Sequence, residues 1–211
     1  MHIMLTQSNT PLKRLVATLL AAGLVLPTGL AWAEYKGENP MQESRDVAAA
    51  MLKELGQKLK AAMGEGGPIN AIGVCNTEAP AIALRIGTKE KITITRVSTR
   101  ARNPVLGVPN DWQAEALKQF EDGLAKGQAP AEMEYVQAVK AGGGSRMELR
   151  YAKPIVTQAM CLACHGDPEH IQADVKTKLD QLYPNDKATG YKVGELRGAV
   201  VVSRYIGYNI N

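Results

Sequence analysis

Several features that would place a chain in a common functional class are missing from this sequence of 211 residues. No basic cluster is longer than two residues and the formal net charge is only +4, so charge gives no argument for nucleic-acid binding. There is no internal repeat and no low-complexity tract, and no apolar run after residue 26 is long enough to span a bilayer. With 45% apolar and 22% charged residues, the composition is that of a globular domain.

The first 33 residues have the pattern of a secretory signal peptide. Lys13 and Arg14 form the basic start, residues 15–26 form the apolar core, and Ala31-Trp32-Ala33 supplies the small residues that signal peptidase reads. The core is shorter than the ~20 residues of a membrane helix, which disfavours the alternative of an uncleaved anchor. We therefore expect cleavage before Glu34, a periplasmic location and no stable membrane insertion of the mature chain.

The order of predicted elements, helices first and then strands interrupted by helices, indicates an α+β fold with an antiparallel sheet flanked by helices. After a linker that begins at residue 34, apolar residues at four-residue spacing predict a long N-terminal helix that ends at Gly64–Gly67. Its apolar stripe is interpreted as core packing, and residues 68–211 as the main domain. Gly142-Gly143-Gly144 predicts a hairpin turn. Further helices are predicted at 68–75, 78–86, 110–127 and 167–183, and strands at 92–96, 132–140, 145–153 and 198–205.

One motif carries specific chemistry. The segment Cys161-Leu162-Ala163-Cys164-His165 matches C-x-x-C-H, the attachment signature of haem c. Two thiols at this spacing can each add to one vinyl group on the same haem edge, and the adjacent imidazole then lies over the iron. The sequence therefore predicts one covalent haem c, with thioethers from Cys161 and Cys164 and with His165 as the proximal ligand.

Three other interpretations of this motif have weaker support. A redox motif of thioredoxin type needs a βαβ context, and none precedes Cys161. A structural zinc site needs four ligands, which Cys75 and the three motif residues could supply. A disulfide between Cys161 and Cys164 would leave His165 without a role. The predicted export favours haem over the zinc site.

The residues alone leave the sixth iron ligand open. His170 follows His165 too closely to reach the opposite haem face, Met160 is badly placed beside Cys161, and Met147 occupies a core position of a predicted strand. Cys75 is the odd cysteine, left without an intramolecular partner once the motif is used. An iron ligand, a buried inert thiol and an intermolecular disulfide all stay open for it.

The chain also resembles a family of secreted monohaem c-type proteins that was first catalogued as a domain of unknown function. The ordered set of matching residues covers most of the chain from about residue 70 onward. It consists of Ile72-Gly73-Val74-Cys75-Asn76, Ala79-Pro80, Ile82-Ala83, Arg96-Val97-Ser98, Arg102-Asn103-Pro104, Pro109-Asn110-Asp111-Trp112, Pro154-Ile155, Cys161-Leu162-Ala163-Cys164-His165-Gly166, Tyr183-Pro184, Asp186, Ala188, Gly190-Tyr191, Gly194 and Arg197-Gly198-Ala199.

This resemblance implies a PAS-like fold and haem ligation by cysteine and histidine, with Cys75 as the distal thiolate opposite His165. A thiolate ligand stabilises ferric iron, so the reduction potential should be low. Chemistry alone makes four arginines candidates for the haem propionates. They are Arg96, Arg100, Arg102 and Arg197. The stretch from Ser98 to Ala101 fits the family pattern only loosely, which leaves the roles of Arg96 and Arg100 open.

Three functions are compatible with these expectations. A single haem in a secreted domain favours a periplasmic electron-transfer cytochrome, whereas the PAS-like resemblance favours a redox or gas sensor. Either would act on a separate redox or signalling protein. A haem peroxidase is disfavoured because few histidines are present for acid–base chemistry, so we expect no enzymatic activity. The long N-terminal helix would also allow a dimer.

Overall fold

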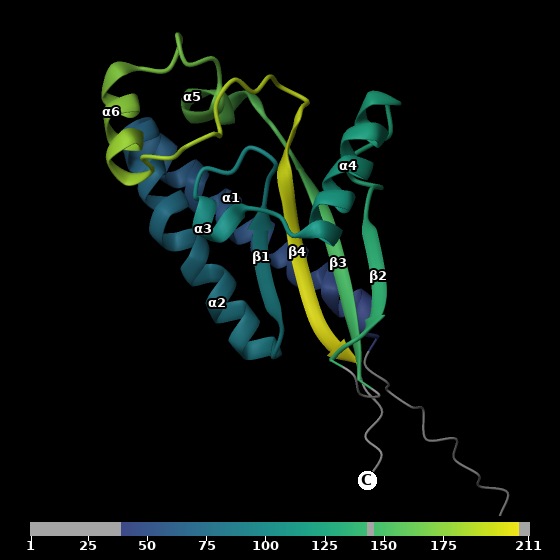
Figure 1. The fold of residues 1–211 in the computed structure, drawn as a ribbon. Coiled ribbons are helices and arrows are strands. Elements are labelled where there is room, and N and C mark those ends of the chain that lie inside the picture. Colours follow the sequence, from purple (N-terminus) through teal and green to yellow (C-terminus); the bar gives the residue numbers. More distant parts are fainter. Residues whose placement is uncertain (1–38, 143–145, 207–211) are drawn as a thin grey trace, which may run out of the picture. The chain divides into compact units, whose positions relative to one another are not determined.

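A four-stranded antiparallel sheet forms the centre of the chain in a computed structural model that describes residues 39–142 and 146–206. The strand order is β1-β4-β3-β2, so the last strand of the chain lies in the interior of the sheet (Figure 1). The predicted α+β class with an antiparallel sheet is confirmed. The strands are β1 (Thr93–Val97), β2 (Tyr135–Lys140), β3 (Met147–Val156) and β4 (Leu196–Ile206).

The register of the sheet follows from alternating side chains and from one hairpin. Strands β2 and β3 pair from Tyr135 opposite Ala152 to Lys140 opposite Met147, which confirms the predicted hairpin. Gly143 and Gly144 of its turn lie outside the described residues, as do the predicted signal peptide and residues 34–38 of the linker. Strand β4 pairs with both β1 and β3, and its alternating valines are buried in two apolar clusters, Val200 and Val202 in one and Val201 in the other.

The long helix α1 (Pro40–Gly73) covers one face of this sheet. It begins where Asn39 accepts a hydrogen bond from the Gln42 amide (3.1 Å), with proline in the first turn. Val47, Met51 and Leu55 are buried against the sheet and α2, so this part of the stripe packs into the core as predicted, whereas Leu59 and Met63 line a cavity. No helix within the described ranges is long and apolar enough to cross a membrane.

The helical run changes direction at the glycines where the sequence predicts an end. Gly66 and Gly67 leave helical geometry, with a φ of 66° at Gly67, and Pro68 starts the next turn. From there the chain continues through a π-helical turn, η1 (Val74–Glu78), into α2 (Ala79–Glu90). The two short helices predicted at 68–75 and 78–86 are therefore joined, because the π-turn inserts a wider turn without breaking the helix.

The opposite face of the sheet packs against α4 (Asp111–Ala125). Its start is a capping box, in which Asn110 and Gln113 each bond the other's backbone amide. Leu117 and Phe120 pack on Ala152 and Val201 of the sheet. Between β1 and α4, the predicted loop contains one short helix, α3 (Pro104–Gly107).

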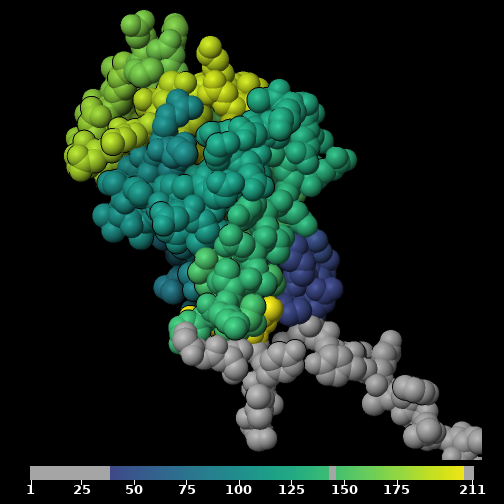
Figure 2. Space-filling view, turned by 45° about the vertical axis from the view of Figure 1, so that its right-hand side comes forward, coloured from purple at the N-terminus to yellow at the C-terminus, as the bar shows by residue number. Residues whose placement is uncertain are grey.

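A third apolar cluster closes one end of the sheet. It joins Ile72 of α1 to Val175 and Leu179 of α6 (Ala173–Leu182). Two short turns precede α6, namely η2 (Ala159–Cys161) and α5 (Leu162–His165). In Figure 2 the light green and yellow atoms of α6 and of the segment before β4 gather at this end.

The prediction that the last helix starts at Asp167-Pro168 is wrong. Asp167 instead closes a tight turn, accepting from the Glu169 amide with its side chain (3.0 Å) and from the His170 amide with its carbonyl (2.9 Å). Helix α6 therefore begins only at Ala173. The aspartate pattern of a helix cap and of a turn is the same, since both satisfy nearby backbone amides.

Two glycine substitutions are expected to change stability in opposite directions. An added Cβ at Gly198 (φ 153°) would lie 2.2 Å from the Val97 carbonyl oxygen, so Gly198→Ala should destabilise the fold by about 1–3 kcal/mol. A Cβ at Gly56 in α1 would meet nothing within 4 Å, so Gly56→Ala should stabilise it by about 0.5–1 kcal/mol. Urea unfolding of both variants measures the two changes in the free energy of unfolding. Equal stability of the two would contradict the described backbone at Gly198.

Candidate cofactor site

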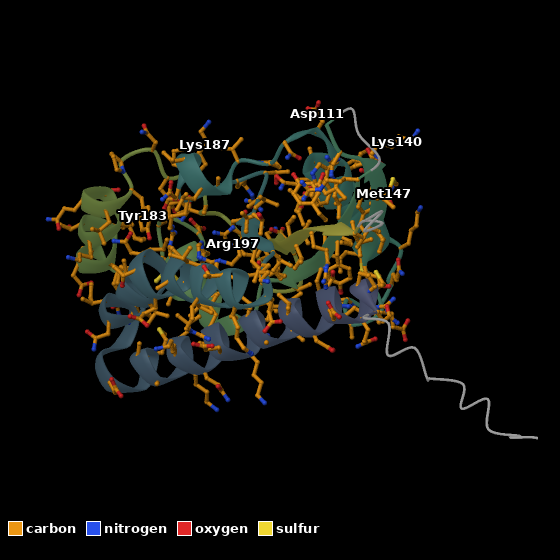
Figure 3. All side chains as sticks on the ribbon, turned by 90° about the horizontal axis from the view of Figure 1, so that it is seen from below. Asp111, Lys140, Met147, Tyr183, Lys187 and Arg197 are labelled. Atoms are coloured by element: carbon orange, nitrogen blue, oxygen red, sulfur yellow. The ribbon has the colours of Figure 1, made fainter. Side chains whose placement is uncertain are left out.

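A single large cavity brings together the residues that the sequence singles out. Its volume is about 1110 Å³, slightly above the roughly 300–1,000 Å³ typical of ligand pockets. Cys75, Cys161, Cys164 and His165 all line it, although they come from three different elements. Many of the other lining residues are apolar, among them Met51, Leu55, Ile72, Ala79, Ile94 and Ile155. Two further lining residues, Tyr183 and Arg197, are labelled in Figure 3.

The two motif cysteines lie on consecutive short turns. Cys161 ends η2 and Cys164 lies in α5, so the two thiols are three residues apart along a helical path. At this spacing side chains share one face of a helix. Burial raises the pKa of the Cys164 thiol, which leaves it protonated at neutral pH, while the Arg102 charge opposes this shift. Both thiols are half-buried and line the cavity.

His165 is fixed by hydrogen bonds at both ring nitrogens. Its Nδ1 lies 2.7 Å from the Ala188 carbonyl oxygen, which can only accept, so Nδ1 carries the proton. The lone pair of Nε2 therefore remains on the cavity side, where the Arg197 Nε donates to it at 3.5 Å. Burial, followed by the charges of Arg197 and Arg102, holds the pKa of His165 well below its usual value. A neutral ring with an unprotonated Nε2 is the form that binds a metal, and a metal would take the lone pair that accepts from Arg197 in this structure.

Cys75 lies in the π-helical turn η1, on an element remote in sequence from the motif. π-turns are rare and occur often at functional sites, because the extra residue re-aims the side chains that follow. The thiol is half-buried and lines the same cavity as His165. Neighbouring groups are cationic, since Arg96 and Arg197 both lie within electrostatic range of the Cys75 sulfur.

Two of the arginines that line the cavity, Arg96 and Arg197, give it positive charge. Burial lowers the pKa of Arg96, while the Cys75 sulfur raises it. Burial also lowers the pKa of Arg197, which Tyr191 partly offsets. An arginine side chain nevertheless stays charged in proteins, so both guanidinium groups present donors and charge to the cavity. This environment suits carboxylates and a thiolate.

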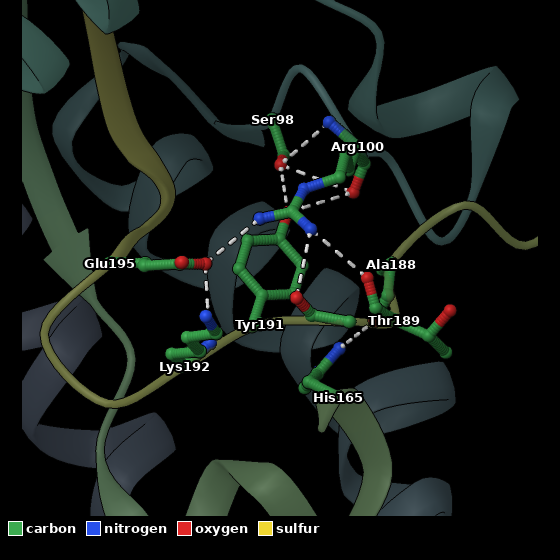
Figure 4. A network of polar contacts seen from close by, with 9 residues as sticks. Ser98, Arg100, His165, Ala188, Thr189, Tyr191, Lys192 and Glu195 are labelled. Carbon is green, nitrogen blue, oxygen red and sulfur yellow. Dashed lines mark hydrogen bonds and ion pairs between the residues drawn. The ribbon is translucent and has the colours of Figure 1, made fainter. Parts of the chain in front are cut away.

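The other two predicted arginines have different surroundings. Arg100 does not line the cavity, and its guanidinium lies 3.5 Å from the Tyr191 ring centroid while bonding the carbonyls of Thr189 and Gly190 (Figure 4). Arg102 lines the cavity, but its Nε donates to Asp186 (2.9 Å) and its Nη2 donates to backbone carbonyls. The assignment of all four arginines to propionates stays a prediction, and three of them, Arg96, Arg102 and Arg197, line the cavity.

The structure also separates the alternatives for a second ligand. His170 is 83% exposed beside Asp167, and Met147 pairs with Ile206 in the sheet; neither lines the cavity. Met160 does line it, together with Cys75. In the described part of the chain, no three His, Cys, Asp or Glu side chains are placed to share one metal ion, so the zinc alternative has no ligand set there.

Three residues that surround His165 have no function predicted from the sequence. Asp186, Ala188 and Tyr191 belong to a segment that crosses the motif: the Tyr191 amide donates to the His165 carbonyl (2.9 Å), and the Tyr191 ring meets the imidazole edge-on with centroids 6.1 Å apart. All three fall in the run of residues that matches the family pattern. That run was the only signal in the sequence, because the contacts span more than 20 residues.

Comparisons with known proteins agree with this arrangement. A solved structure described as the cyanobacterial heme-protein Tll0287 matches with a TM-score of 0.59 and 24% sequence identity, covering 81% of this chain and 99% of that chain. At this identity the likeness shows a shared fold. Curated proteins gave no match. The model of the Tll0287-like family matches residues 33–204, which is most of the sequence. The chain therefore belongs to the Tll0287-like family.

Proposed function

We propose that this chain is a periplasmic monohaem c-type protein, with His165 and Cys75 as axial ligands, that serves electron transfer or redox sensing. One observation carries the proposal: the C-x-x-C-H motif and the odd cysteine, on different elements, line the same largely apolar cavity together with Arg96 and Arg197. The structure with the same fold is described as a heme-protein, which supports the same cofactor.

The residues present fit a haem. Cys161 and Cys164 would form the two thioethers, each by adding its S–H across one vinyl C=C bond, with no oxidant needed. The Nε2 of His165 would be the proximal ligand and the Cys75 sulfur the distal one. Arg96 and Arg197 would hold the propionates, because guanidinium groups pair with carboxylates by charge-assisted hydrogen bonds.

The bound haem would supply one-electron exchange, and the chain would set its potential. A thiolate from Cys75 favours the ferric state, whereas the charges of Arg96 and Arg197 favour the ferrous state and limit that shift. Neither His165 nor Cys75 leaves an open position for a substrate, so the proposal includes no enzymatic activity. The electron or signal would pass to a separate protein.

The haem content and the ferric spectrum of the purified protein test this function. Produced in a host that attaches haem c, the wild type should carry one haem per chain and give a six-coordinate, low-spin ferric spectrum that exogenous ligands do not change. A high-spin ferric spectrum, or a chain without haem, would contradict the proposal.

Carbon monoxide then distinguishes an electron carrier from the alternative of a gas-sensing module. An electron carrier should keep both ligands after reduction and leave carbon monoxide unbound. Binding of carbon monoxide only after reduction would favour a gas-sensing module, because the distal thiolate would then have left the iron. Binding is measured by the shift of the main optical band.

A further inference from the structure

The peptide of Ala188 connects His165 to a buried ion pair. Residues 186–191, here called the strap, lie across the motif: Ala188 accepts from His165 Nδ1 (2.7 Å), and the Gly190 amide donates to the Gly166 carbonyl (2.7 Å). Figure 4 shows the bond from His165 to the strap. The orientation of the imidazole thus depends on where the Ala188 carbonyl is held.

Arg102 and Asp186 hold the Ala188 backbone at both its amide and its carbonyl. An oxygen of Asp186 accepts from the Ala188 amide (2.7 Å), and Arg102 Nη2 donates to the Ala188 carbonyl (3.3 Å). Arg102 Nε donates to the other Asp186 oxygen (2.9 Å), and its Nη2 also donates to the Cys164 carbonyl. The two side chains are only 8% and 11% exposed, so the pair is shielded from water.

This arrangement joins the strap and the motif through one guanidinium. Arg102 bonds Cys164, which directly precedes His165, and it bonds Ala188, which accepts from the His165 ring. Planar guanidinium donors in a fixed fork can reach all three acceptors at once, whereas an ammonium group cannot hold the same geometry. Hydrogen-bond partners behind a ligating histidine fix its tautomer and ring orientation.

We propose that Arg102 and Asp186 are positioning residues that hold the His165 ring in a single orientation as an iron ligand. This inference rests on the proposed function, in which His165 ligates the haem iron. Neither side chain needs to touch the iron, since both act through the Ala188 and Cys164 backbone. Because Arg102 and Asp186 neutralise each other, the pair places no uncompensated charge beside His165.

The substitution Arg102→Lys separates positioning from charge. Lysine keeps the positive charge but loses the fork, so the ring should adopt more than one orientation. We expect the single low-spin ferric electron-resonance signal of the wild-type holoprotein to be lost and replaced by at least two overlapping signals. The matched control is Arg45→Lys, which changes the bidentate pair of Arg45 with Glu134 outside the cavity and should leave the signal unchanged.

A second variant keeps the test valid if Arg102→Lys does not fold, which circular dichroism would reveal. Asp186→Asn keeps an oxygen acceptor for the Ala188 amide but weakens the bond to Arg102, so it should give the same splitting with a larger remaining wild-type fraction. Unchanged electron-resonance signals in a folded variant would overturn the proposal. A wild type that lacks a His165-dependent low-spin signal would instead overturn the proposed function.

Discussion

Replacing Cys75 with alanine is expected to abolish the low-spin ferric signal of the loaded protein. Cys75 and His165 line one cavity from different elements, so loss of the thiol removes one of two axial ligands and leaves an open coordination position. The iron should become high-spin, and its midpoint potential should rise by on the order of 0.1 V, within the roughly 0.8 V range that axial ligands span. Optical and electron-resonance spectra measure the first change, and a redox titration measures the second.

Met160→Ala is the matched control for this experiment. Met160 is one of the methionines that line the cavity, and it directly precedes Cys161. If Cys75 is the ligand, Met160→Ala should keep the wild-type spectrum. The opposite outcome, an unchanged spectrum in Cys75→Ala and a high-spin one in Met160→Ala, would assign the distal position to methionine.

Local sequence signals predict the elements of this fold well. Asn110 with Gln113 marks the start of α4, and Gly66 with Gly67 marks the kink of α1, because capping and chain reversal each depend on neighbouring residues. The same locality explains the error at Asp167, whose side chain bonds nearby amides in a turn as readily as in a helix cap.

The surroundings of the site could not be predicted in this way. The C-x-x-C-H spacing reveals the motif, but the partners of His165 depend on Arg102 bonding Asp186 across 84 positions of sequence. No periodicity or cap connects residues so far apart. The π-turn that carries Cys75 is equally invisible, since its sequence reads as ordinary helix on both sides.

Replacing both Cys161 and Cys164 with alanine is expected to make the haem fully extractable. The two thiols lie three residues apart on consecutive helical turns and line the cavity together, so each can form one thioether to the same haem edge. Acid-acetone should leave the haem with the wild-type protein, and intact mass should include it. Each single variant should retain one thioether and therefore the haem mass.

Cys75→Ala provides the control that separates attachment from ligation. It also removes one thiol from the cavity, yet it should keep the haem covalently bound while its spectrum changes. The double variant should do the reverse, because His165 and Cys75 remain to ligate a haem that is no longer attached. Extraction of haem from the wild type would contradict covalent attachment. If the variants behave as expected, the three cysteines of the chain divide into two that attach the cofactor and one that sets its electronic state.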